Sequence, residues 1–434
     1  MGTSLLPLPT PGRAGRRLLV QPHAPLVGLA LVSLASLASR AAWLGNPGRA
    51  VVGDEVTYVN VARTILGIPV APGSLTLFNP AAYRVGLDVN TPHPPLAKLL
   101  IAGSMKLFGD NPVGWRLPSR ILGSAAIVAL YWLVRSANGS SWLALGAASL
   151  MAVDNLFLVY GRTATIEIFA IPFMLVGTAL YLRGRPIVAG LALGIGTLTK
   201  EVGVLALFVL GVMEVLRLAL PQTVHVGERR RSFVKPLRAL ALCGAVTVVS
   251  YLGPLGAMDA QFSRFHNPIT HTEFMFGFHK VYAPSLVEPS SSAGYHLAQP
   301  SSPLEWLVNR KVVPLYWYPV PIQDARILFL SEMNPMIIGF ALAGLLWATY
   351  TAWLRRDQVS FLIVAWCLGT FLPFLVVSTR VGYLYYLLAV LPGICLGVVR
   401  LLGSSVVPRP LVVVYCVPLA FFAWYLYPFR FGVG

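Results

Sequence analysis

The sequence has few charged residues. Only 11% of its 434 residues are Asp, Glu, Lys or Arg, whereas a soluble domain of average composition has about a quarter. Hydrophobic residues make up 56% of the chain and recur in runs of about 18 residues or more, which is the length needed to cross a bilayer. This composition excludes an ordinary soluble domain and predicts an all-α membrane protein that crosses the bilayer many times.

Cysteine is also scarce. Cys243, Cys367, Cys395 and Cys416 all lie inside apolar runs, and no pair has the spacing of a zinc site or a redox motif. We expect them to pack as small hydrophobic residues. The sequence therefore predicts neither a disulfide framework nor a metal centre built on cysteine.

Acidic residues are half as frequent as basic ones, 16 against 33, and the net charge is +17. Nucleic-acid-binding proteins share such an excess. Here, however, the basic residues lie largely between the apolar runs, where they orient a membrane protein. We therefore predict a lipid bilayer and no nucleic acid as a partner.

The apolar runs number eleven, and we predict a membrane-spanning helix at each: 24–44, 117–134, 141–158, 166–182, 186–199, 203–218, 237–256, 333–354, 359–377, 382–399 and 410–428. Four parts follow from these runs. They are a disordered cytoplasmic tail (1–23), a catalytic membrane module of seven spans with a first outer loop at 45–116 (24–256), a large outer loop (257–332) and a C-terminal module of four spans (333–434).

Arginine placement sets the predicted orientation. If the basic tail is cytoplasmic and the spans alternate, the inner connections contain Arg135, Arg183, Arg355 and the triplet Arg229–Arg231, as the positive-inside rule requires. An additional span at 95–109 would move that triplet outside. We therefore predict that 95–109 is a helix lying along the outer surface, in a multi-pass protein of the plasma (inner) membrane.

The acidic residues gather on the outer side of this topology. Of the 16, only Glu214, Glu228 and Asp357 lie inside or at inner span ends. Acidic residues contribute little to membrane orientation, so their placement needs another cause. We predict an active site on the outer face.

Two segments of the first outer loop have residues suited to catalysis. Asp54 and Glu55 follow the first span and can serve as a general base with a supporting acceptor or as metal ligands. They can equally be acids that complement a helix dipole. His93 and Lys98 flank two prolines that launch a helix, which is typical of a phosphate site but also of a stiffened loop whose lysine reaches the lipid headgroups.

Seven segments follow one another between residues 54 and 392. They are Asp54-Glu55, His93-Pro-Pro-Leu-Ala-Lys98, Gly114-Trp-Arg-Leu-Pro-Ser119, Asp154 to Arg162 with Glu167, Gly194 to Gly203 with Lys200, Ser302-Pro-Leu-Glu-Trp306, and Asn334-Pro335 with Arg380 and Tyr383 to Pro392. Together they resemble the protein O-mannosyltransferases, a family of the GT-C membrane glycosyltransferases that also include the aminoarabinose transferases. The resemblance implies the GT-C fold, with about 11 transmembrane helices, a helical first outer loop and one larger outer loop.

This chain departs from the family pattern at three places. Glu167 stands where the family often has Asp, and the large outer loop has no room for the β-trefoil domain of eukaryotic members. His93 precedes the Pro-Pro pair, where the aminoarabinose transferases typically have Lys. The last difference favours the mannosyltransferases.

The resemblance implies an inverting enzyme that moves mannose from polyprenyl-phosphate-mannose to Ser or Thr hydroxyls of exported proteins. We predict Asp54 as the general base and Glu55 as the residue that orients it. The predicted donor-phosphate contacts are cations that can stabilise the leaving group, namely His93, Lys98, Arg116, Arg162, Lys200 and Arg380. The predicted sugar and acceptor contacts are Tyr58, Asp154, Glu167, Glu305 and Trp306.

No cofactor is predicted, because a donor linked through a monophosphate does not require a metal for its departure. A divalent ion at Asp54 and Asp154 is the alternative. Two other functions stay open, a GT-C transferase that glycosylates a lipid or polysaccharide and a transporter of a polyprenyl-linked sugar. The transporter is less favoured, since the chain has no matching halves.

Overall fold

The computed structural model describes residues 23–45, 53–70, 84–220, 234–281, 301–310, 313–317, 328–376 and 382–430. The α-helices are α1 Ala24–Ala41, α2 Glu55–Leu66, α3 Leu96–Phe108, α4 Pro112–Ser136, α5 Ser141–Val153, α6 Asn155–Tyr160, α7 Ala170–Leu182, α8 Pro186–Thr199, α9 Leu205–Ala219, α10 Val234–Phe262, α11 Pro268–Val281, α12 Pro303–Trp306, α13 Pro335–Gly339, α14 Ala341–Arg355, α15 Gln358–Val376, α16 Leu387–Leu402 and α17 Arg409–Tyr425. Short 3₁₀ helices are η3 Glu167–Phe169, η4 Glu201–Val204 and η6 Leu384–Tyr386. Several helices begin with proline, whose missing N–H costs nothing in the first turn.

Each predicted span coincides with a helical segment, so the all-α polytopic fold is confirmed. Six described helical segments are long and apolar enough to cross a membrane: Ala24–Ala41, Pro112–Ser136, Glu201–Ala219, Val234–Phe262, Gln358–Val376 and Leu384–Leu402. Shorter apolar helices lie at Ser141–Val153, Glu167–Leu182, Pro186–Thr199 and Arg409–Tyr425. The number of eleven spans stays a prediction.

Small residues let the helices pack closely. A Cβ on Gly190 of α8 would lie only 2.6 Å from the Cys243 carbonyl oxygen of α10, and one on Gly344 of α14 would lie 2.7 Å from the Gly397 carbonyl carbon of α16. Close backbone approach through small residues is the usual way in which membrane helices gain packing contacts.

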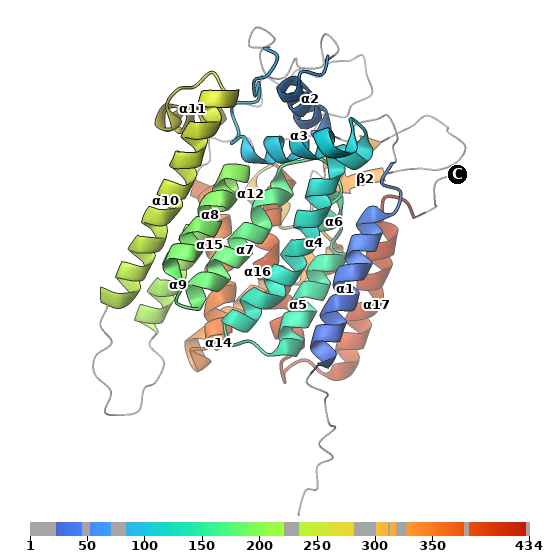
Figure 1. The fold of residues 1–434 in the computed structure, drawn as a ribbon. Coiled ribbons are helices and arrows are strands. Elements are labelled where there is room, and N and C mark those ends of the chain that lie inside the picture. The colour runs from blue at the N-terminus through green and yellow to red at the C-terminus, as the bar shows by residue number, and fades with distance from the viewer. Residues whose placement is uncertain are drawn as a thin grey trace, which may run out of the picture.

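One end of the bundle, which we call the upper end, has α2, α3 and α11 (Figure 1). There α3 lies across the bundle instead of along it (Figure 1), as predicted for a surface helix at 95–109. The first residues of α1 and α10 lie at the opposite, lower end (Figure 1). The first residues of α1 and of α10 therefore lie at the same end of the bundle, as the predicted topology requires.

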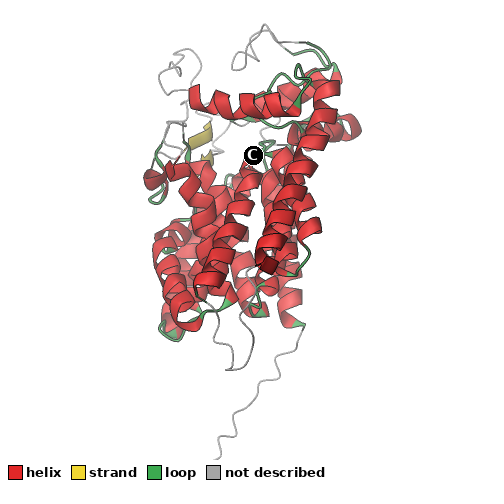
Figure 2. Cartoon of the chain, turned by 90° about the vertical axis from the view of Figure 1, so that its left-hand side faces the viewer, coloured by secondary structure: helices red, strands yellow, loops and turns green. Residues whose placement is uncertain are grey.

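The large outer loop contains the strands of the structure. Strands β1 Val313–Trp317 and β2 Leu328–Ser331 pair antiparallel, with Val313 opposite Ser331 and Trp317 opposite Leu328. Figure 2 shows this small sheet toward the upper end of an otherwise helical chain. The prediction of a purely helical chain missed it.

Candidate active site

The loop before α3 is held in place by Lys98. The side chain is fully buried, and its Nζ lies 2.6 Å from Asp88 Oδ2. The same nitrogen donates to the carbonyl oxygen of His93 at 2.8 Å and to that of Asn90. The predicted contact of Lys98 with a donor phosphate has no support in this geometry, since the ammonium is bound by the loop that it stabilises.

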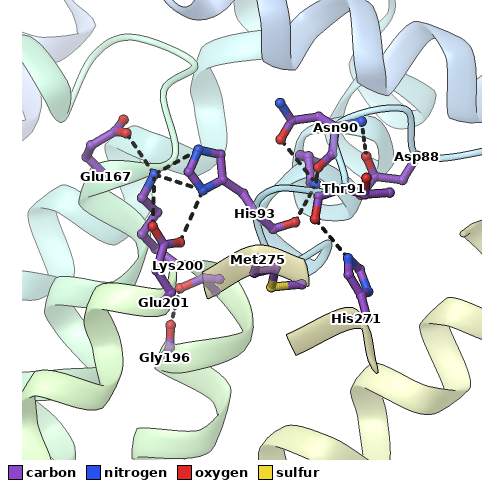
Figure 3. A network of polar contacts seen from close by, with 12 residues as sticks. Asp88, Asn90, Thr91, His93, Glu167, Gly196, Lys200, Glu201, His271 and Met275 are labelled. Atoms are coloured by element: carbon purple, nitrogen blue, oxygen red, sulfur yellow. Dashed lines mark hydrogen bonds and ion pairs between the residues drawn. The ribbon is translucent and has the colours of Figure 1, made fainter. Parts of the chain in front are cut away.

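A second set of bonds holds the same loop from α10 and α11. His271 Nδ1 lies 2.7 Å from Asp259 Oδ1. Its Nε2 lies 2.8 Å from the Thr91 carbonyl oxygen (Figure 3). These two contacts join α10 and α11 to the loop before α3. These two residues are absent from the predicted site, because nothing in their spacing links them to Thr91.

The His93 side chain lies within a cluster of charged groups. Its Nδ1 is 3.2 Å from Glu201 Oε2, and Lys200 Nζ is 3.4 Å from both ring nitrogens (Figure 3). Lys200 Nζ also lies 3.3 Å from Glu167 Oε1. We call His93, Glu167, Lys200 and Glu201 the Lys200 cluster.

The imidazole of His93 is neutral at physiological pH. Burial and then the positive charge of Lys200 lower the pKa of His93 to about 4, although the Glu201 carboxylate opposes this. The contact with Glu201 is therefore a hydrogen bond donated by neutral imidazole. A neutral imidazole can contact a phosphate only by hydrogen bonding, so the lowered pKa gives no support to a cationic role for His93.

Asp54 faces the Lys200 cluster from the N-cap position of α2. Its side chain caps no backbone N–H, and among the described residues no hydrogen bond ties its carboxylate to another side chain. Burial and the nearby Glu167 carboxylate raise the pKa of Asp54 to about 6, against the opposing effect of Lys200. A carboxylate with its pKa near the working pH suits a general base.

Tyr58 follows one turn later in α2 and is buried. Its ring centroid lies 6.4 Å from that of His93. Burial, together with Glu167 and Asp54, raises the pKa of Tyr58, so its hydroxyl stays protonated. The predicted residues that the structure brings together are Asp54, Tyr58, His93, Glu167 and Lys200.

Glu55 and Arg116 form a buried ion pair with each other. The guanidinium of Arg116 binds both Glu55 oxygens, at 2.8 and 2.9 Å, and the N–H of Ala164 donates to Glu55 Oε1 at 2.7 Å. Both side chains are buried. This pair fixes α2 against α4, and the geometry supports neither Glu55 as the residue that orients Asp54 nor Arg116 as a phosphate contact.

Asp154 and Arg162 also have structural partners. Asp154 accepts from the N–H of Phe157 at 3.0 Å and from that of Asn334 at 2.9 Å, which joins α6 to α13. Arg162 donates to the Ala42 carbonyl oxygen at 2.8 Å, and its guanidinium lies 4.3 Å from the Phe429 ring centroid. Neither contributes to the Lys200 cluster.

The last three predicted residues belong to the C-terminal half. The carboxylate of Glu305 accepts from the Ser302 N–H at 2.9 Å and caps α12. Trp306 donates to Ser301 Oγ at 2.9 Å and packs with its ring 5.7 Å from that of Tyr386, so it supports the site indirectly. Arg380 lies outside the described residues.

An apolar cavity of about 470 Å³ opens at the Lys200 cluster. Three charged residues of the cluster line it, and its other walls are largely apolar side chains from α9, α10, α11, α15, η6 and α16. Among the lining residues are Phe208, Val248, Tyr251, Met275, Phe276, Phe374, Tyr385, Tyr386 and Leu388. Such a cavity suits a long apolar chain with a polar head at Lys200.

Comparisons with known proteins agree with the sequence resemblance. The family model for dolichyl-phosphate-mannose-protein mannosyltransferase matches residues 92–252. A polyprenol-phosphate-mannose--protein mannosyltransferase from Mycolicibacterium smegmatis is 24% identical over 438 residues, which cover 86% of this chain and 81% of the relative. Over these ranges the chain is similar to the protein O-mannosyltransferases.

Solved structures of membrane glycosyltransferases show the same fold. The Saccharomyces cerevisiae Pmt1-Pmt2 complex bound to the sugar donor has a TM-score of 0.67 at 14% identity, with 94% of this chain and 90% of that chain covered. The apo oligosaccharyltransferase of Archaeoglobus fulgidus has a TM-score of 0.54 at 15% identity. That match covers 95% of this chain but only 57% of the archaeal one. The GT-C fold is thereby confirmed.

Proposed function

We propose that this protein is an inverting glycosyltransferase that moves mannose from polyprenyl-phosphate-mannose to Ser or Thr hydroxyls of exported proteins. The observation that carries the proposal is the apolar cavity that ends at the Lys200 cluster, with Asp54 beside it. The name of the mycobacterial relative and the donor bound to the yeast complex support the donor class.

In this proposal the polyprenyl chain occupies the apolar cavity, and its phosphate lies at Lys200. One lysine is not enough, because the carboxylates of Glu167 and Glu201 already lie 3.3 and 3.9 Å from its ammonium. A second cation must therefore meet the phosphate, and we propose Arg380 for this role. Glu167 and Tyr58 then remain for hydrogen bonds with the mannose hydroxyls.

Transfer proceeds by direct displacement. The acceptor oxygen forms a bond with the anomeric carbon while the bond between that carbon and the phosphate oxygen breaks, and the acceptor proton passes to a carboxylate oxygen of Asp54. The bonding pair leaves with the phosphate, whose charge the two cations stabilise. One displacement from the opposite face inverts the anomeric configuration.

The outer face of the plasma membrane is the proposed location, with the N-terminus in the cytoplasm. Two features of the sequence support it: arginines gather in the predicted inner connections, and most acidic residues lie in the predicted outer segments or at outer span ends. A cysteine-accessibility scan tests it. Reagents added to intact cells should label a cysteine placed at Lys106 and leave one placed at Arg183 unlabelled.

We also propose that no divalent metal is needed, because the leaving group is a phosphate monoester anion that two cations can stabilise. Activity should therefore survive EDTA. A complete loss that only added Mg²⁺ or Mn²⁺ restores would contradict this part of the proposal.

The reaction is tested with purified protein in lipid nanodiscs, labelled polyprenyl-phosphate-mannose and two acceptors in parallel, a Ser/Thr-rich peptide and a membrane glycolipid. The proposal expects label on the peptide, linked with inverted configuration by NMR. Label on the glycolipid alone would replace the protein acceptor by a lipid one. Uptake of donor into sealed vesicles without transfer would indicate a transporter.

A further inference from the structure

Four buried arginines converge near the upper end of the bundle, away from the Lys200 cluster. Arg40 lies in the last turn of α1, Arg116 and Arg120 lie one turn apart on α4, and Arg162 follows α6. None is more than 3% exposed, and none lines the apolar cavity. We call these four residues the arginine cluster.

Glycines bring the members together. A Cβ on Gly123 of α4 would lie 3.5 Å from Arg40 Nε and 3.2 Å from the Cα of Gly161, the residue before Arg162. Gly123 lies three residues after Arg120, on the same side of α4. Arg120 is close enough to Arg40, Arg116 and Arg162 for each of them to repel it.

The described part of the chain supplies too little negative charge here. Its one carboxylate in an ion pair with the arginine cluster is Glu55, which binds Arg116 through both oxygens. Arg40 has the carbonyl oxygen of Ser36 at 3.2 Å and the face of Phe157 at 5.0 Å instead of a carboxylate. Three buried guanidinium groups thus have no carboxylate partner among the residues that the structure describes.

Individual nitrogen atoms show the same deficit. Within the described residues, five buried guanidinium nitrogens have no hydrogen-bond partner: Nε and Nη2 of Arg40, Nε and Nη2 of Arg120, and Nη1 of Arg162. Buried polar groups are nearly always hydrogen-bonded, and an unpaired buried charge is strongly destabilising. An anion is the partner that satisfies both requirements.

We propose that the arginine cluster binds an anionic phosphate group, from the headgroup of a lipid with net negative charge or from phosphate in solution. The planar guanidinium fork matches phosphate oxygens two at a time, which is why arginine is preferred at such sites. A lipid can reach this part of the bundle, because α1 exposes Leu31, Leu34 and Leu37 on its surface. The proposal is independent of the mannosyl-transfer reaction.

The test is thermal unfolding in nanodiscs, in buffer free of phosphate and sulfate. Wild type, Arg120→Met and the control Arg63→Met are compared in phosphatidylcholine alone, with added phosphatidylglycerol, and with millimolar inorganic phosphate. Arg63 is a matched control because it is an arginine of α2 that already has a carboxylate partner, Asp110 at 2.9 Å.

Phosphatidylglycerol or inorganic phosphate should raise the Tm of wild type and of Arg63→Met by about 3 °C or more, as expected for a ligand that binds only the folded state. Arg120→Met should lose this shift, and in phosphatidylcholine alone its Tm should equal or exceed that of wild type, since an unpaired buried charge is gone. A response to phosphatidylglycerol alone identifies the headgroup, whereas a response to inorganic phosphate identifies a soluble anion.

Two results would overturn the proposal. One is a wild-type Tm that neither anion raises, and the other is a full shift retained by Arg120→Met. If Arg120→Met does not fold, Arg40→Met reaches the same arginine cluster from α1 and is judged by the same two results.

Discussion

The protonation of Asp54 should control the acid side of the pH profile. Its pKa is raised to about 6 by burial and by Glu167, so a simple titration gives about nine-tenths ionised at pH 7 and about one-tenth at pH 5. Because the base must be ionised to accept the acceptor proton, kcat/KM should fall about tenfold between these pH values. Glu167→Gln removes a charge that raises the pKa of Asp54, and should move this decline below pH 6.

Asp54→Asn should lower kcat by about 10²–10⁴, the usual contribution of a general base. The same variant should be more stable than wild type at pH 7. The carboxyl group of Asp54 holds its proton more tightly in the native state than in the unfolded chain. The wild-type protein therefore loses stability as the pH rises from about 4 through about 6. A shift of two pKa units corresponds to a loss of at most about 3 kcal/mol in the free energy of unfolding.

The assay is initial-rate mannosyl transfer from pH 4.5 to 8 in nanodiscs, with thermal unfolding of the same samples. Asp110→Asn is the matched control, since this carboxylate lies at the upper end in an exposed pair with Arg63. An acid limb that stays near pH 6 in the residual activity of Asp54→Asn would refute the reasoning, because another group would then be titrating.

Three further variants test the surrounding site. Lys200→Gln should raise the KM for the donor at least tenfold, because the phosphate loses a charge-assisted hydrogen bond. The measurement is a donor titration, and an unchanged KM with a lower kcat would contradict the prediction. Lys98→Met should destabilise the protein by about 3–5 kcal/mol, because it leaves Asp88 buried and unpaired. Lys106→Met, at an exposed position, is the control and should not destabilise it. Equal Tm values for the two variants would refute the anchoring role of Lys98. His271→Gln should lower kcat/KM and loosen the loop that bears Thr91, detected as faster amide exchange, and unchanged exchange would contradict it.

The fold could be predicted because it follows from local properties of the chain. The apolar runs and the placement of the arginines predicted the spans and the crosswise helix α3. That helix follows two prolines and carries charge at Lys98 and Lys106. The strand pair of β1 and β2 was missed, because it is short and its register depends on contacts within the large outer loop.

The candidate site could be predicted only in part, because sequence order does not reveal the partners of a charge. Asp54 and Glu55 are neighbours in the chain, but consecutive helical residues point about 100° apart, and only Glu55 meets Arg116. The motif around Lys98 predicted a phosphate contact, whereas its partner Asp88 lies earlier in the loop, outside that motif. The contacts of His93 with Glu201 and of Thr91 with His271 join residues more than one hundred positions apart, beyond the reach of a local pattern.

The most direct test of the central claim is single-turnover transfer of labelled mannose from polyprenyl-phosphate-mannose to a Ser/Thr-rich peptide by purified protein and its Asp54→Asn variant. Donor binding to both proteins is measured alongside. The account predicts transfer by wild type, and in Asp54→Asn a rate lower by about 10² or more with donor binding retained. An Asp54→Asn variant that transfers mannose at more than about a tenth of the wild-type rate would contradict Asp54 as the base.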